Sequence, residues 1–278
     1  IDCIVTNFAP IALQVARNKI PVVNIATPWE TPHSGLSELP SFPVSRKKIV
    51  TDEQILDQLN KCGFKNLPSS LVSALQGDFP FFIFEKGFDY PKNLLSRGTG
   101  YPFLRPITDK KESKKLSVFI YIHNQYPGAQ KLKKAIVDSL HSINCTVDIY
   151  DPEPSSFSHS RIKHVGKLTH QELTEKYNLV IHSGGLGLSQ LLYASRIFQV
   201  AIPQHAEQNQ NALSIKELGA GLTMAPIPVK VNSQLLSFLK QDIQAIFNFN
   251  PDTSVGLTPK DSRLDYSTAF ADLMSSMT

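Results

Sequence analysis

A glycine-rich turn between an apolar strand and an apolar helix is the part of this sequence best suited to chemistry. Residues 180–188 read Val-Ile-His-Ser-Gly-Gly-Leu-Gly-Leu. A phosphate needs backbone N–H groups that it can approach closely, and glycines remove the side chains that would block it. The helix that follows adds the positive end of its dipole. The pattern predicts a phosphate site at Gly184, Gly185 and Gly187, with the Ser183 hydroxyl as a further donor. Tight packing alone would also explain the same glycines.

A second polar segment follows the next strand. That strand, 199–202, ends at Pro203, and Glu207, Gln208 and Asn211 lie at the start of a helix. In a doubly wound sheet the ligand lies beyond the carboxyl ends of the strands, so both segments would face one crevice. A carboxylate beside an amide can bind sugar hydroxyls there. Acidic residues also favour helix starts without any ligand.

Short apolar runs alternate with helical patterns, which predicts parallel sheets with crossover helices. We expect strands at 3–6, 21–26, 79–84, 116–122, 145–150, 179–182 and 198–202, with a short run at 162–165. We expect helices at 9–19, 52–62, 67–76, 129–142, 169–177, 188–195, 206–218 and 233–247. The charged, aperiodic segment 110–115 separates two such alternations. The sequence therefore predicts an α/β protein with two Rossmann-like domains, 1–112 and 113–278, each a parallel sheet with helices on both faces.

Composition excludes several classes of protein. Of the 278 residues 41% are hydrophobic and 19% are charged, as in a soluble globular protein. The net charge of +4 comes with short basic clusters that lack interleaved aromatics, which argues against nucleic-acid binding. The 3 cysteines have neither disulfide nor metal spacing and indicate a reducing compartment. No apolar run reaches the roughly 20 residues of a membrane span. We therefore expect a cytoplasmic protein without a metal site.

Residues 178–222 resemble the donor-binding signature of GT-B glycosyltransferases of the UDP-glycosyltransferase type. That family carries a His-His-Gly-Gly-x-Gly-Thr turn and, further along, Pro-x-x-x-Asp-Gln-x-x-Asn-Ala. This chain has His-Ser-Gly-Gly-Leu-Gly from His182, and Pro203 followed by Glu207-Gln208 and Asn211-Ala212. The resemblance implies sugar transfer, with inversion, from a nucleoside diphosphate to the hydroxyl of a small-molecule or lipid acceptor. No further cofactor is implied.

The resemblance also assigns the donor contacts. They are His182, Ser183, Gly184, Gly185, Gly187 and Leu188 in the turn, Glu207, Gln208 and Asn211 after the next strand, and Asn124, Val165 and Lys167 in two earlier loops. The glycine turn would hold the diphosphate, Glu207 and Gln208 the sugar, and backbone groups of 165–168 the base. The sequence does not indicate which base, sugar or acceptor is bound, nor an oligomeric state.

Four positions depart from the family pattern. Ser183 replaces the second histidine, Leu188 the threonine, Leu191 the acidic residue that holds the ribose, and Glu207 the usual aspartate. An alternative is therefore a homologue that keeps the fold without turnover and binds a partner. A third reading, a sugar-nucleotide epimerase, would need further acidic and histidine residues in the cleft.

The family's catalytic base, generally a histidine, follows the first strand of the amino-terminal domain. This chain opens on a strand-like run without a methionine, and residues 1–26 are similar to a strand-helix-strand late in that domain. We therefore expect the first domain to be incomplete, the base to lie upstream of Ile1, and the chain alone not to transfer sugar. His33, in a polar loop, is the candidate among the residues present.

Overall fold

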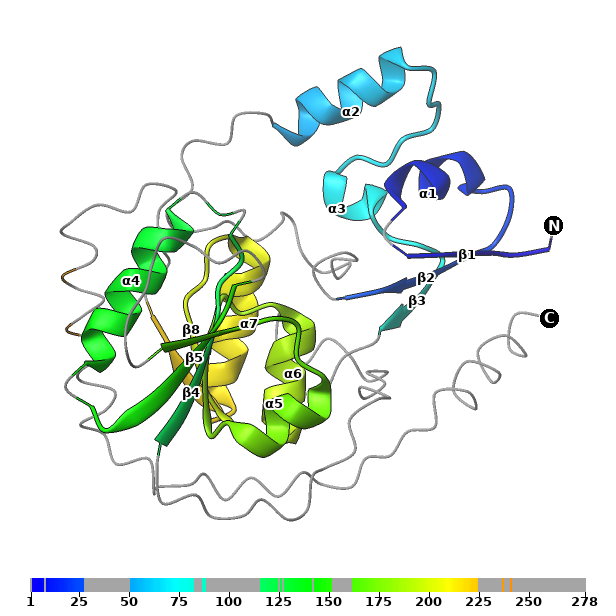
Figure 1. Ribbon diagram of the computed structural model, residues 1–278. Helices are drawn as coiled ribbons and strands as arrows, with labels where there is room; N and C mark the ends of the chain where they lie inside the picture. The colour runs from blue at the N-terminus through cyan, green and yellow to red at the C-terminus, as the bar shows by residue number, and fades with distance from the viewer. Residues whose placement is uncertain are drawn as a thin grey trace. The chain divides into compact units, whose positions relative to one another are not determined.

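The structure, a computed structural model, describes residues 2–7, 9–27, 51–82, 87–88, 116–124, 126, 128–141, 143–151, 162–224, 237 and 241. They form two compact units, one within residues 1–103 and the other within 104–260 (Figure 1). Three predictions lie outside the described residues: the domain boundary at 112 and 113, the candidate base His33, and most of the helix at 233–247.

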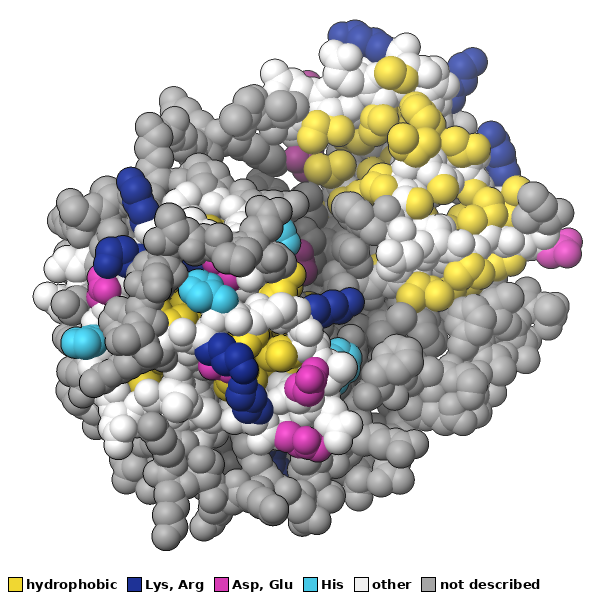
Figure 2. Space-filling model, in the orientation of Figure 1, with side chains coloured by type: hydrophobic (Ala, Val, Ile, Leu, Met, Phe, Trp, Pro, Cys, Tyr) yellow, Lys and Arg dark blue, Asp and Glu magenta, His cyan; other side chains and the backbone are white. Residues whose placement is uncertain are grey.

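The first unit contains a three-stranded parallel sheet in the order β1-β2-β3. Its strands are β1 (Ile4–Thr6), β2 (Val22–Ala26) and β3 (Phe79–Phe82), and its helices are α1 (Pro10–Ala16), α2 (Asp52–Lys61) and α3 (Leu71–Ala74). Leu13, Ala16 and Val22 form a small core with Ile4 packed against it. The helix α1 also exposes apolar side chains, with Ile11 66% and Val15 55% accessible, and yellow side chains gather over this unit in Figure 2.

The helix expected at 67–76 is much shorter than predicted. Pro68 disfavours a helical backbone at Leu67, and the Ser70 side chain caps the helix start by accepting from the Ser73 N–H. Helix α3 therefore begins at Leu71. The strands expected at 3–6 and 21–26 are confirmed within one residue.

The second unit is a six-stranded parallel sheet in the order β6-β5-β4-β7-β8-β9. Its strands are β4 (Leu116–Tyr121), β5 (Cys145–Tyr150), β6 (Ile162–Val165), β7 (Leu179–His182), β8 (Phe198–Ala201) and β9 (Gly221–Thr223), and its helices are α4 (Ala129–Leu140), α5 (His170–Lys176), α6 (Leu186–Ala194) and α7 (Ala206–Glu217). The four strands expected here are confirmed, the short run at 162–165 is also a strand, and β9 is an addition. This is the doubly wound α/β arrangement that the sequence predicts.

Alternating residues of the central strand β4 build the two faces of this sheet. Val118 and Ile120 are buried in a cluster that includes Leu132 and Ile136 of α4. Phe119, on the other face, is buried in a cluster with Leu173 of α5 and Leu191 and Leu192 of α6. Helices therefore cover both faces of the sheet, as expected (Figure 1).

Candidate functional site

The connectivity of the second unit places a switch point between β4 and β7. From β4 the chain winds outward through β5 to β6, and it then returns to β7 on the other side of β4. Tyr121 pairs with His182, so the loops after these two strands leave the sheet at the same level. In open α/β sheets the ligand crevice forms at this point, outside the carboxyl ends of the strands. The predicted glycine turn forms one side of it.

The first two glycines of the turn have different structural roles. Gly184 has φ +88°, and a Cβ there would lie 2.8 Å from the backbone oxygen of Gln208. Gly185 has φ −62°, and a Cβ there would meet nothing within 4 Å. Gly184 is therefore required by the backbone, whereas Gly185 leaves open space beside the start of α6.

The buried side chain of His182 supports the glycine turn. Its ring is fully buried, Nδ1 accepts from the Gly184 N–H at 3.1 Å, and Nε2 lies 3.0 Å from Oε1 of Gln199. The Gln199 amide donates to the Ser189 carbonyl at 3.1 Å, so its oxygen faces His182 and Nε2 carries the proton. Burial lowers the pKa of His182 to about 4. The neutral ring thus bonds to the protein through both nitrogens and supports the turn.

The side-chain amides of Gln208 and Asn211, predicted to contact the sugar donor, form hydrogen bonds between the loops of the crevice. Asn211 donates to the Gly184 carbonyl at 2.9 Å. Gln208, only 4% accessible, accepts from the Gln204 N–H at 2.9 Å and donates to the Tyr126 hydroxyl at 2.8 Å. These contacts connect the segments after β4, β7 and β8.

Helix α6 begins at Leu186, two residues earlier than the sequence suggested. Gly187 therefore lies in its first turn, and its N-cap residue is Gly185, which supplies no side-chain cap. Helices α4 and α7 also start without a side-chain cap, at Gly128 and His205. Backbone N–H groups of a first turn have no partner within their own helix. Three helix starts at the carboxyl edge of the sheet are thus left without side-chain caps.

The remaining predicted residues lie around this edge. Ser183 is 8% accessible, Glu207 is half-buried in the first turn of α7, and Leu188 packs against the cluster on the α5 and α6 face. Val165 is the last residue of β6, and the exposed Lys167 follows it. This strand lies at the edge of the sheet, with β5 and β4 between it and β7. The structure therefore brings the turn, Gln208 and Asn211 together, but not the 165–168 segment.

A buried charged network beside the crevice was not predicted. Lys133, 1% accessible, donates to Asn124 Oδ1 at 2.6 Å and to the Tyr150 carbonyl at 3.0 Å. Asn124 in turn donates to Asp151 Oδ1 at 2.9 Å, and Asp151 Oδ2 lies 3.5 Å from His164 Nδ1. Burial lowers the pKa of Lys133, and the charge of Asp151 opposes that shift. The network fixes the predicted donor residue Asn124 at the end of β4.

A signal for this network was present in the sequence. Lys133 follows Ala129 by four residues and precedes Val137 by four, so it lies on the apolar face of the helix. A lysine at such a position needs buried partners. Asp151, directly after a strand at the same edge, is one of them.

Leu191, which replaces the family's ribose-binding acid, is part of the core. It is 5% accessible and buried with Phe119, Tyr177 and Leu192. In the described part of the chain no group of three or more His, Cys, Asp and Glu side chains could hold a metal. The described helices include none with the length and apolar character to cross a membrane.

Comparison with solved structures identifies the fold. No protein-family profile and no curated protein sequence matches the chain. The glycotransferase of kitacinnamycin aligns with TM-score 0.57 and 15% identity over 88% of this chain and 72% of its own length. The calicheamicin glycosyltransferase aligns with TM-score 0.58 and 13% identity over 99% and 73%. The spinosyn rhamnosyltransferase complexed with thymidine diphosphate aligns with TM-score 0.55 and 15% identity over 89% and 64%.

These structures confirm the resemblance in fold to GT-B glycosyltransferases. At identities of 13 to 15% they establish the architecture and not the substrates. The chain spans 64 to 73% of the length of these three proteins.

Proposed function

We propose that this chain binds a nucleoside-diphosphate sugar and serves transfer of the sugar to an acceptor hydroxyl with inversion. The observation that carries the proposal is the open side of Gly185 at the uncapped start of α6, at the switch point of the sheet. The fold shared with glycosyltransferases supports it, because one of them is solved with thymidine diphosphate.

The chemistry follows from the start of α6. Its first-turn N–H groups and helix dipole favour an anion there, so the diphosphate would lie beside Gly185 and within reach of the Ser183 hydroxyl. When the sugar leaves, negative charge grows on the diphosphate, and preorganised N–H groups stabilise that charge in the transition state. Glu207 would hold sugar hydroxyls. Gln208 would donate its second amide N–H, since the first is engaged by Tyr126.

The acceptor hydroxyl needs a general base, which typically contributes about 10²–10⁴-fold in rate. We place this base outside the second unit. Within the second unit His182 is unsuited, because its ring is buried and both nitrogens are engaged. His33 remains a candidate by sequence alone.

One observation favours a second function, a homologue that keeps the fold without turnover. Leu191 is buried in the core at the position where the family holds the ribose with a carboxylate. A leucine there removes two hydrogen bonds to the nucleotide. In this alternative the chain acts as an auxiliary subunit that binds a partner.

Calorimetric titration with thymidine diphosphate and uridine diphosphate tests the site. We expect the unaltered chain to bind at least one of them, and Gly185→Val to weaken binding at least tenfold, because valine fills the space beside the helix start. The melting temperature should stay the same, since this position accepts a Cβ. The control is Thr146→Val, at the exposed amino end of β5 in the same sheet.

The outcomes separate the two functions. Unchanged affinity in Gly185→Val would contradict the placement of the diphosphate. Binding that depends on Gly185, without transfer when the chain is assayed with nucleotide sugars and acceptors, would favour the auxiliary subunit. Robust transfer by residues 1–278 would contradict the auxiliary subunit.

A further inference from the structure

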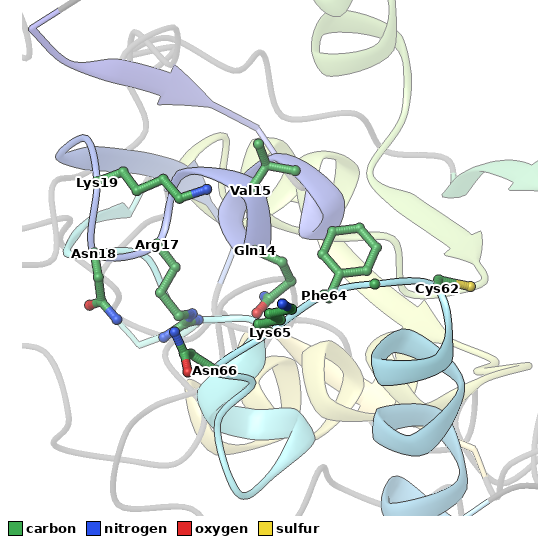
Figure 3. Close-up of a pocket in the computed structure, with 10 residues that line it drawn as sticks. Gln14, Val15, Arg17, Asn18, Lys19, Cys62, Phe64, Lys65 and Asn66 are labelled. Atoms are coloured by element: carbon green, nitrogen blue, oxygen red, sulfur yellow. The ribbon is translucent and has the colours of Figure 1, made fainter.

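The first unit has a hollow of about 450 Å³ between the end of α1 and the segment after α2 (Figure 3). It is lined by Gln14, Val15, Arg17, Asn18, Lys19, Cys62, Gly63, Phe64, Lys65 and Asn66. Its volume is in the range of small-molecule sites, about 300–1,000 Å³. It is therefore large enough for a small organic ligand.

The lining of this hollow is positively charged. Arg17, Lys19 and Lys65 contribute three cations, and none of the lining residues that the structure describes is acidic. The ammonium groups of Lys19 and Lys65 form no ion pair or side-chain hydrogen bond in the described part of the chain, whereas Lys61 and Lys176 each pair with an aspartate. Uncompensated cations around a concave surface attract anions.

The wall also contains polar atoms without protein partners. Arg17 donates only from Nη2, to the carbonyls of Ser73, Ala74 and Gln76 at 3.0, 3.3 and 3.4 Å, which fixes its guanidinium at the end of α3. Among the described residues its Nε has no acceptor and Gln14 Oε1 has no donor, and both atoms are buried. A buried polar atom that lacks a partner costs about 1–3 kcal/mol. A ligand with oxygen acceptors and a hydroxyl would supply both partners after a small rotation of these side chains.

The uncharged lining residues indicate which kind of anion the hollow would favour. The Phe64 ring is half-buried and Val15 is exposed, so one wall is apolar. The amides of Asn18 and Asn66 add donors for oxygen atoms (Figure 3). Lysine ammonium groups bind phosphate well, and an apolar wall favours a ligand with a carbon skeleton over a bare ion.

The hollow lies away from the edge of the sheet at which α/β proteins usually bind their substrates. Helix α1 leads from the carboxyl end of β1 to the amino end of β2, so Arg17 and Lys19 lie toward the amino edge of the sheet. Substrate crevices of α/β sheets form at the opposite edge. A ligand here would occupy a second site.

We propose that this hollow binds a phosphate monoester with an apolar group, through Lys19, Lys65 and Arg17. The phosphate can belong to a soluble ester or to the head group of a phosphatidic-acid-type lipid. This site is independent of the donor site proposed for the glycine turn.

Titration of the 278-residue chain with phenyl phosphate tests the proposal. The variant is Lys19→Glu/Lys65→Glu, and the control is Lys163→Glu/Lys216→Glu, which makes the same change of net charge at two exposed lysines of the second unit. Gly185→Val reports any binding at the glycine turn. We expect at least a tenfold loss of affinity in Lys19→Glu/Lys65→Glu, and unchanged affinity in the control and in Gly185→Val.

Sedimentation with phosphatidylcholine vesicles that contain phosphatidic acid distinguishes the two sources. Binding of phenyl phosphate that depends on Lys19 and Lys65 supports a soluble ester, and vesicle binding with the same dependence supports a lipid head group. Equal affinities in the two double variants, loss of phenyl phosphate binding in Gly185→Val, or binding of an acidic peptide alone would each overturn the proposal.

Discussion

Helices α5 and α6 of the second unit begin in two different ways. At the start of α5, Thr169 accepts from the Glu172 N–H at 3.2 Å, and the Glu172 carboxylate accepts from the Thr169 N–H at 2.8 Å. The Thr169 N–H, together with the Thr169 hydroxyl, which donates to the same carboxylate at 2.8 Å, holds the pKa of Glu172 below its usual value. At the start of α6, Gly185 supplies no side chain.

This difference in capping determines whether each helix start can accept a ligand. The capping box of α5 satisfies the N–H groups of Thr169 and Glu172 from within the chain and places a carboxylate at the helix start, which disfavours a bound anion there. The start of α6 stays open, and the turn before it is held by buried contacts of His182 and Asn211 with Gly184. An open site for an anion thus depends on a network that stabilises the turn from the other side.

The largest expected effect is a difference in stability between substitutions at Gly184 and at Gly185. Gly184→Ala introduces a Cβ 2.8 Å from a backbone oxygen at φ +88°. Backbone strain and overpacking of about 1–3 kcal/mol each predict a loss of about 4 kcal/mol in the free energy of unfolding. Gly185→Ala should change it by less than about 0.5 kcal/mol. Urea unfolding measures both, and equal stabilities would contradict the assigned roles.

The next effect is a pH dependence of the network under α6. His182 has a pKa lowered from 6.5 to about 4, so between these values the unfolded chain binds a proton that the folded chain excludes. Stability is therefore complete above pH 6.5 and falls as the pH drops toward 4, by about 3 kcal/mol in total.

The check is the difference between the unaltered chain and His182→Gln. The free energy of unfolding is measured for both between pH 7 and pH 4, roughly the span set by the two pKa values. Glutamine keeps an amide in the network and does not titrate. A constant difference across this range would show that His182 is not held neutral by its burial.

The architecture was largely predictable because it depends on local patterns. Apolar runs and helical periodicity identified the first five strands of the second unit, whereas β9 was missed. Its three residues carry little pattern, and their place as a strand depends on pairing with β8, where a Cβ on Gly221 would lie 1.9 Å from the Gln199 oxygen. Such a close approach is a tertiary property that local sequence does not show.

The site was predictable in part. The glycine turn was identified from its composition, but the partners of its side chains were not, since they come from distant segments. Gln208 bonds to Tyr126, 82 residues away, and Asn211 bonds to Gly184, 27 residues away. The sequence indicated polar residues near a ligand. The structure shows that Gln208 and Asn211 among them form hydrogen bonds with other residues of the chain.

A smaller effect is expected at the closed helix start. Thr169→Ala removes the cap of α5 and should lower the free energy of unfolding by about 1 kcal/mol. Affinity for a nucleoside diphosphate should not change, because this N-terminus is not part of the proposed site. Thermal unfolding and calorimetry give the two quantities. A large loss of affinity would mean that the α5 start also contacts the nucleotide.

The smallest expected change in stability comes from giving α6 the kind of cap that α5 has. Gly185 is already the N-cap residue, in an extended conformation that any residue adopts, and its Cβ would project into open space. In Gly185→Asp, the carboxylate can accept from first-turn N–H groups and interact with the helix dipole. Asp is better than Gly at this position by only a few tenths of a kcal/mol. The variant should therefore be as stable as the unaltered chain, or slightly more stable.

The same substitution should abolish nucleoside-diphosphate binding, because the carboxylate occupies the N–H groups and repels a second anion. Gly185→Ser is the matched variant, since it caps the helix without adding charge. It should weaken binding less than Gly185→Asp does, with the gap between the two narrowing as salt is added. Calorimetry at two salt concentrations, together with urea unfolding, measures all of these quantities. If Gly185→Asp gained stability yet bound the nucleotide as before, the first turn of α6 would be an ordinary helix start, and the diphosphate would have to be sought elsewhere along the carboxyl edge.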